Sequence, residues 1–216
     1  LDATACVRAR AEGSLPPGPA GEAYFARVAA TVQPVIDQVI GMRVGGARPP
    51  VDVDLGFGDA RLSGRIGGLW AEGHLIHQMS KVRAKHRLAA WVQHLALHAM
   101  GWAGRTAIVG RDRTDLIAPL RREPRALLAD LLELHALGMR TPLMFFPDPS
   151  EAWVRTRGKA DAVFRNWGRF GDPDLFARVV LGDALPTDVD PRLVAPGADF
   201  HHLAVRVFGP LAEHLA

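Results

Sequence analysis

The residues best suited to chemistry in this chain lie between positions 73 and 111, where basic residues and histidines occur without a single aspartate or glutamate. The basic side chains of this stretch are Lys81, Arg83, Lys85, Arg87, Arg105 and Arg111. Such a segment can bind a polyanion, but it lacks the one or two carboxylates that normally hold Mg²⁺. The pattern therefore predicts a core that binds and assembles and does not cleave.

Other residues with catalytic potential have simpler explanations. His94 and His98 have the four-residue spacing of paired zinc ligands, but the intervening Leu-Ala-Leu lacks the glutamate that a zinc protease needs. Asp52 and Asp54 fall two apart on one strand face, where they could share a cation or simply form a solvated surface. Ser63 does not lie in a Gly-x-Ser-x-Gly elbow, so nucleophilic catalysis has little support.

Length and composition indicate a globular protein. The 216 residues are enough for one well-buried domain with a helical appendage, and their formal net charge is +3. The sequence has no apolar run of transmembrane length, so we expect no membrane contact. The single cysteine, Cys6, excludes a disulfide framework and favours a reducing, cytoplasmic location. The chain begins at Leu1 and not at a methionine, so we expect it to be a fragment of a larger protein.

The first forty residues divide at about position 20. Residues 1–20 contain the run Gly13–Pro19, which neither a helix nor a strand can absorb, so we take them as a linker and the end of a preceding region. Residues 21–216 form the predicted domain. It opens with apolar residues at three- and four-residue steps up to Ile40, which predicts an amphipathic helix that Pro34 should kink or break.

The middle of the chain alternates strand and helix patterns. Val51–Leu55, Arg61–Leu69 and His74–Met79 are predicted strands, the first two forming a hairpin, and Lys85–Met100 is a strongly helical segment. Further strands are expected at 106–109 and 115–117, and further helices at 123–137, 150–166, 172–181 and 199–215, with a core connector at 142–149. This order predicts an α/β protein of the α+β kind: a mixed sheet flanked by helices, with additional C-terminal helices.

The segment Arg61–Lys81, followed by the helix near Lys85, resembles the core of the PD-(D/E)xK nuclease superfamily, which implies a restriction-endonuclease-like fold. In active members an aspartate on the second strand and an acid-x-lysine on the third hold the metals. Here the aspartate position falls on Gly67 or Gly68. The third-strand positions fall on His77, Gln78 and Met79, which cannot replace a carboxylate. The resemblance therefore implies a degenerate site with no catalytic residue, no metal and no cofactor.

The basic run Lys81–Arg87 is the candidate DNA-binding segment. Four phosphate contacts would give a log–log salt dependence with a slope of about −3 to −4, because each neutralised phosphate releases counterions. We therefore take Lys81, Arg83, Lys85 and Arg87 as candidate contacts, with Arg65, whose guanidinium would lie where the nuclease metal sits. A solvated loop, or pairing with the acids of a partner subunit, would explain the same run.

Seven short segments together carry a closer and more extensive resemblance. They are Leu15–Gly21, Leu62–Leu69, Lys81–Leu88 followed by Trp91 and His94–Leu95, Leu127–Leu132, Pro142–Pro147, Gly171–Pro173 and Val207–Leu211. In their order and spacing the chain resembles the C-terminal region of RecC, the gamma subunit of exodeoxyribonuclease V (the RecBCD complex). This resemblance implies a degenerate nuclease fold that guides split DNA strands and docks the RecB and RecD subunits.

The leading hypothesis is thus a non-catalytic domain of a helicase–nuclease that acts in double-strand-break repair by homologous recombination. ATP and DNA would be hydrolysed elsewhere in that complex, and this domain would support subunit assembly and DNA strand routing. One alternative is an active metal-dependent DNA nuclease that uses Asp52, Asp54 or Asp59. The other is a pure protein-interaction module without DNA contact.

Overall fold

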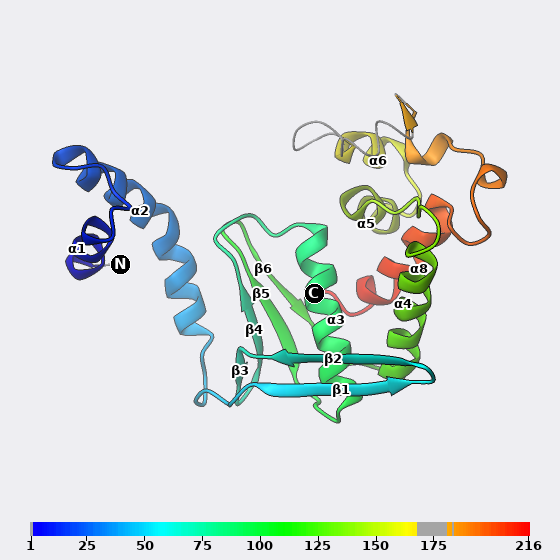
Figure 1. Ribbon diagram of the computed structural model, residues 1–216, viewed down its shortest axis with the longest axis horizontal. Coiled ribbons are helices and arrows are strands. Elements are labelled where there is room, and N and C mark those ends of the chain that lie inside the picture. The colour runs from blue at the N-terminus through cyan, green and yellow to red at the C-terminus, as the bar shows by residue number, and fades with distance from the viewer. Residues whose placement is uncertain (1, 168–180, 183) are drawn as a thin grey trace.

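The fold is a mixed α+β arrangement of two sheets and surrounding helices (Figure 1). A computed structural model describes residues 2–167, 181–182 and 184–216. The strands are β1 (Val51–Phe57), β2 (Ala60–Ile66), β3 (Leu69–Trp70), β4 (Gly73–His77), β5 (Arg105–Val109) and β6 (Thr114–Ile117). The helices are α1 (Ala3–Ala11), α2 (Pro19–Gly41), α3 (Ala84–Ala99), α4 (Pro124–Gly138), α5 (Pro147–Arg155), α6 (Ala160–Asn166) and α8 (Phe200–Ala212), with 3₁₀ turns η1 (Pro186–Asp188) and η2 (Pro191–Leu193). The predicted mixed sheet flanked by helices, with additional C-terminal helices, is confirmed.

The larger sheet has the strand order β3-β4-β5-β6. Strands β4 and β5 are parallel, so the chain must cross over between them, and α3 makes that crossover. The other two pairings are antiparallel. The C-terminus closes the β6 edge, because Leu215 bridges Ile117 and the backbone N–H of Ala216 donates to the carbonyl of Leu116 at 2.9 Å. The edge is thereby protected from pairing with another chain.

The β1–β2 hairpin forms a separate two-stranded sheet, which corrects the prediction of one strand over Arg61–Leu69. Strand β2 ends at Ile66, and the chain turns before β3 begins. Gly68 makes this turn with a φ of 70°, and a Cβ there would lie 2.5 Å from the carbonyl oxygen of Leu75. A side chain at this position is therefore excluded by backbone conformation and by contact, which gives the glycine a structural reason.

Helix α3 lies on one face of the larger sheet and fills the main core. Its Trp91 and Leu95 are almost fully buried. The period of two along β5 sends Ile108 into this core and Ala107 to the opposite face. The hairpin, α4 and α8 add apolar side chains to the same cluster, including Val53, Leu55, Leu128, Leu203 and Phe208. Each buried side chain of this size stabilises the fold by roughly 1.5–3 kcal/mol relative to an exposed one.

Helices α1 and α2 stand away from the rest of the molecule (Figure 1). Helix α2 continues through Pro34 without a break. Only its C-terminal part packs on the sheet, where Val35 and Val39 contact the face opposite α3. Tyr24 and Val28, nearer its start, are exposed. In the described part of the chain, none of the helices combines the length and apolar character needed to span a membrane.

The helical segment predicted at 150–166 is two helices, α5 and α6. Arg157 and Gly158 have φ values of 54° and 86°, so the chain leaves the right-handed helical region between them. The connector at 142–149 is core as predicted, since Phe145 stacks on Phe208 with ring centroids 5.9 Å apart, and α5 already begins at Pro147. The helix predicted at 172–181 and the segment Gly171–Pro173 lie outside the described residues, apart from position 181.

Two buried histidines meet at one hydroxyl inside the main core. The Nδ1 atoms of His74 and His94 lie 3.3 and 2.9 Å from the Oγ1 atom of Thr106. Burial lowers the pKa of His74 to about 4 and that of His94 to about 3. Both rings are therefore neutral in the folded protein at neutral pH, and His94 packs between Trp91 and His98 as a core aromatic residue.

We expect the protein to lose stability as the pH falls below about 6.5. The unfolded chain then binds protons at His74 and His94, whereas the folded chain does not until its much lower pKa values are reached. Each histidine should contribute up to about 1.4 kcal/mol of lost unfolding free energy per pH unit in that window. Urea denaturation across the window measures this slope. It should be shallower in His94→Gln and unchanged in His135→Gln, a control at an exposed position on α4; equal slopes in all three proteins would contradict the account.

Candidate functional site

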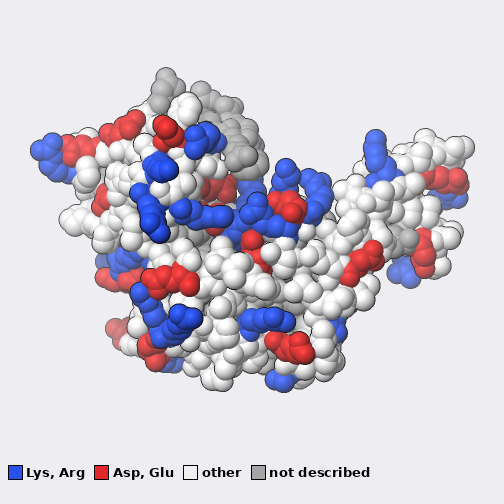
Figure 2. All heavy atoms as spheres, turned by 180° about the vertical axis from the view of Figure 1, so that it is seen from behind, with Lys and Arg blue, Asp and Glu red and all other residues white. Residues whose placement is uncertain are grey.

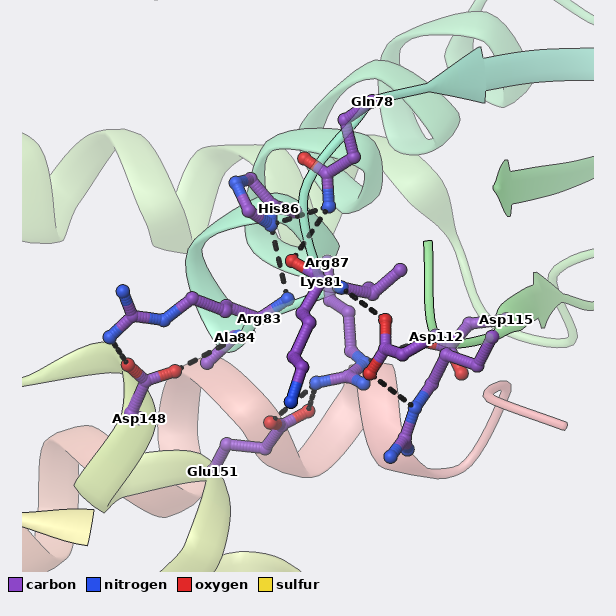
Figure 3. A network of polar contacts seen from close by, with 12 residues as sticks. Gln78, Lys81, Arg83, Ala84, His86, Arg87, Asp112, Asp115, Asp148 and Glu151 are labelled. Carbon is purple, nitrogen blue, oxygen red and sulfur yellow. Dashed lines mark hydrogen bonds and ion pairs between the residues drawn. The ribbon is translucent and has the colours of Figure 1, made fainter. Parts of the chain in front are cut away.

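The start of α3 is held by side chains of the loop that precedes it (Figure 3). Gln78 donates from Nε2 to the carbonyl of Lys81 at 3.2 Å and to Nδ1 of His86 at 2.7 Å. The backbone N–H of Arg83 donates to the same His86 nitrogen at 3.0 Å, which caps the helix. The basic run therefore sits on a fixed junction between β4 and α3.

The guanidinium of Arg87 is buried between two carboxylates (Figure 3). Its Nε donates to Asp115 Oδ2 at 2.7 Å, and its Nη1 donates to the two carboxylate oxygens of Glu151 at 2.8 and 3.1 Å. Only 4% of the Arg87 side chain is exposed. Burial raises the pKa of Glu151, and the positive charge of Arg87 opposes that change. These charge-assisted bonds join α3 to β6 and to α5.

Two further carboxylates hold the backbone and side chains just before Arg87. Asp148 of α5 accepts from Arg83 Nη2 at 2.7 Å and from the backbone N–H of Ala84 at 3.1 Å. Its negative charge thus meets the N-terminus of α3, where the helix dipole is positive. Asp112 accepts from the backbone N–H of Val82 at 2.8 Å. The run is therefore anchored to acids that lie beyond position 111.

These contacts correct the expectation of a core without carboxylates. The segment 73–111 lacks acids in sequence, but β6 and α5 bring Asp115, Asp148 and Glu151 against it in space. Arg87 is consequently removed from the candidate DNA contacts, because its guanidinium is buried and already bound. The sequence contained an indication that Arg87 is buried, because it lies four residues before Trp91 and therefore on the apolar face of the helix. A buried charge requires a partner of opposite charge.

The remaining candidate DNA contacts occupy two places. Lys81 and Lys85 are exposed at the β4–α3 junction, and Arg83 is partly buried beside Asp148. Arg65 lies instead on the separate hairpin, exposed, with its Nε 3.6 Å from Asp52 Oδ1. The structure thus brings three of the predicted residues together and leaves Arg65 apart from them.

The positions predicted to be degenerate metal ligands have structural explanations. Gly67 and Gly68 form the turn between β2 and β3, and the carbonyl of Gly68 accepts from the N–H of Leu75 at 2.8 Å. His77 ends β4 with an exposed side chain, Gln78 holds the α3 junction, and Met79 is exposed. Within the described residues, no group of three or more histidine, cysteine or acidic side chains is arranged to hold a metal ion.

The carboxylates of the nuclease alternative lie on the outer face of the hairpin. Asp54 accepts two hydrogen bonds from Arg61, at 2.6 and 2.5 Å, and Asp52 faces Arg65. Both aspartates are exposed, as a solvated strand face requires, and Asp59 is exposed in the turn of the hairpin. They belong to a different sheet from the junction that holds the basic run.

Comparisons with known proteins agree on one family. A family model described as the RecC C-terminal domain matches residues 1–158. The RecBCD enzyme subunit RecC of Escherichia coli strain K12 is 28% identical over 151 residues, which cover 69% of this chain and 13% of that protein. The RecC subunits of Mycolicibacterium smegmatis and Mycobacterium tuberculosis are 30% and 31% identical, over 69% and 67% of this chain. The chain therefore spans only about 13–14% of the length of these relatives.

We expect Arg87→Met to destabilise the fold by about 3–5 kcal/mol, because it leaves two buried carboxylates without their cation. Urea denaturation followed by tryptophan fluorescence measures this loss. Arg61→Met is the matched control, since it breaks an arginine–carboxylate pair on the surface of the hairpin and should change stability little. Equal effects of the two substitutions would show that the buried network does not hold the fold together.

Proposed function

This chain belongs to the RecC C-terminal domain family, and on that premise we propose that it is a non-catalytic part of a RecBCD-type helicase–nuclease. In this role it supports subunit assembly and the routing of DNA strands during double-strand-break repair by homologous recombination. Hydrolysis of ATP and DNA takes place elsewhere in the complex. The matched relatives carry the name of a RecBCD enzyme subunit, which supports the assignment to such a complex.

The observation that carries the non-catalytic proposal is the position of Arg87. The buried carboxylates at the sheet–helix junction, Asp115 and Glu151, are both bound to its guanidinium. A guanidinium supplies a permanent positive charge, but it cannot polarise a phosphate as a Lewis acid or generate a metal-bound hydroxide. These two buried carboxylates therefore stabilise the fold and are not free to hold a metal ion.

The DNA-routing part of the proposal is supported by the surface around that junction. Lys81 and Lys85 are exposed, and neither has an ion-pair partner among the described residues. The Gln78 and His86 contacts hold the backbone of this junction at the start of α3. Exposed cations on a held backbone suit the phosphate backbone of a strand that is guided without being read for its sequence.

The partners implied by this function are RecB and RecD, with DNA inside the assembled complex, at a cytoplasmic location. The arm of α1 and α2 and the outer face of the hairpin offer surfaces for subunit contact. Co-purification of RecB and RecD with the full-length subunit tests this part. Failure of both to co-purify would remove assembly from the proposed role.

The nuclease alternative is tested by incubating the chain with linear duplex DNA and Mg²⁺ or Mn²⁺. We expect no degradation, because the exposed aspartates of the hairpin pair with arginines and the buried carboxylates are bound to Arg87. Asp54→Ala and Glu151→Gln are assayed in parallel. Metal-dependent degradation that either substitution abolishes would overturn the proposal.

The interaction-module alternative is tested by a salt titration of DNA binding in the reconstituted complex. Lys81→Gln/Lys85→Gln should make the log–log slope shallower by about 1.4–1.8, because two phosphate contacts are lost. Arg83 is left intact, since its loss would also release Asp148. Arg140→Gln, at an exposed position after α4, should leave the slope unchanged. An unchanged slope in the double variant would favour a module that does not touch DNA.

A further inference from the structure

An open cavity of about 410 Å³ lies between α5 and α6, beside the Arg87 network. Helix α6 lies beyond residues 1–158, so the family match does not extend over this half of the wall. The polar side chains that line the cavity are Asp148, Glu151, Arg155, Thr156, Arg165 and Asn166. The cavity is large enough to admit part of another molecule. The charges and hydrogen-bonding groups of its lining indicate which class of molecule would bind there.

The acidic side chains of the cavity are already neutralised from within the fold. Asp148 is paired with Arg83, and Glu151 with Arg87, at 2.7 and 2.8 Å. Both carboxylates are largely buried, with 21% and 12% of their side chains exposed. A ligand that enters the cavity therefore meets carboxylates whose charge is compensated by α3.

The two arginines of the cavity, unlike its two carboxylates, are not held in close ion pairs. Arg155 and Arg165 are exposed, and in the described part of the chain neither makes an ion pair within 4.0 Å. Arg155 follows Glu151 by one helical turn, so the two side chains share one face of α5. Arg165 reaches the same cavity from α6. The cavity therefore presents two exposed guanidinium groups from separate helices, and of these Arg155 also exerts its positive charge on the neighbouring Glu151, where it opposes the rise in the pKa of that carboxyl.

The neighbouring uncharged polar groups contribute hydrogen-bonding capacity and do not neutralise the positive charge of the two arginines. The hydroxyl of Thr156 donates to the carbonyl of Ala152 at 2.7 Å, and Asn166 Nδ2 donates to the carbonyl of Ala162 at 2.7 Å. The second N–H of the Asn166 amide is left for a ligand. Two guanidinium groups and an amide donor on facing walls match an anion that has several acceptor oxygens.

We propose that the α5–α6 cavity is a cradle for one phosphodiester group of a nucleic-acid strand, held by Arg155 and Arg165. A phosphodiester offers its charge and oxygen atoms to both helices at once, which suits guanidinium forks better than a point cation. The proposal rests on the proposed strand-routing function and gives it a second site, formed by residues separate from the β4–α3 junction.

A nucleic-acid strand fits better than an acidic protein segment because the cavity adjoins a longer row of cations. Arg83, bound to the cavity residue Asp148, lies two residues from both Lys81 and Lys85. The N–H of Arg111 donates to the carbonyl of Ser80, which brings a further exposed arginine to the same loop. Lysine and arginine side chains also gather in a band on the face shown in Figure 2. A polymer with one charge per repeat can neutralise such a row.

Fluorescence anisotropy with a labelled oligothymidylate of about 12 nucleotides tests the cradle in the full 216-residue chain. Arg155→Gln/Arg165→Gln should weaken binding by on the order of tenfold. It should also make the log–log salt slope shallower by about 1.4, the value for two single-strand phosphate contacts. Arg140→Gln, an exposed arginine outside the cavity, should bind as the unmodified chain does. Thermal unfolding confirms that the variants are folded, since neither cavity arginine has an ion pair to lose among the described residues.

Competition with an oligoglutamate peptide of equal charge separates the two classes of ligand. If the peptide binds and depends on Arg155 and Arg165 while the oligonucleotide does not, the cradle takes acidic protein segments and the proposal is overturned. If oligonucleotide binding weakens in Lys81→Gln/Lys85→Gln but not in the cavity variant, the α5–α6 cavity does not bind the phosphodiester group. The proposed strand-routing function of the β4–α3 junction is then retained. If the unmodified chain does not bind the oligonucleotide at all, both the cradle and direct DNA contact by this domain fail.

Discussion

The structure depends on one buried guanidinium that takes its counterions from two elements distant in sequence. Arg87 leaves the apolar face of α3 and meets Asp115 of β6 and Glu151 of α5. A buried charge is tolerated only when it is paired and hydrogen-bonded, so these three side chains have to come together when the chain folds. Through them the sheet, the crossover helix and the C-terminal helices become one unit.

The same contacts determine which charged side chains are left available to bind a ligand. Because Arg87 and Arg83 are bound to Glu151 and Asp148, the carboxylates near the sheet are no longer free to recruit a metal. The cations that have no such partner stay on the surface, at the β4–α3 junction and in the cavity between α5 and α6. The fold thus neutralises the charged groups beside the sheet and leaves Lys81, Lys85, Arg155 and Arg165 exposed.

Much of the fold could be predicted from local sequence patterns, whereas the contacts around Arg87 and the α5–α6 cavity could not. The helix at 84–99, the hairpin and the strands at 105–117 are close to their predicted positions, because periodicity and turn residues specify them locally. The carboxylates around Arg87 were not predicted, because residues 73–111 contain no acid of their own. The acids that contact Arg87 come from β6 and α5, which are distant in sequence and approach it only in the folded chain. The division of the predicted helix at 150–166 depends on positive φ values at Arg157 and Gly158. The cavity is a consequence of that division, so local propensity could not reveal it.

Arg87 is bound to both Asp115 and Glu151, so neither carboxylate is free to hold a divalent cation while these contacts persist. Crystals of the chain soaked in MnCl₂ and measured at the manganese absorption edge test it most directly. We expect no anomalous peak between these carboxylates, and a guanidinium that is still bound to both. A manganese ion coordinated by Asp115 and Glu151, with the Arg87 side chain displaced, would contradict it.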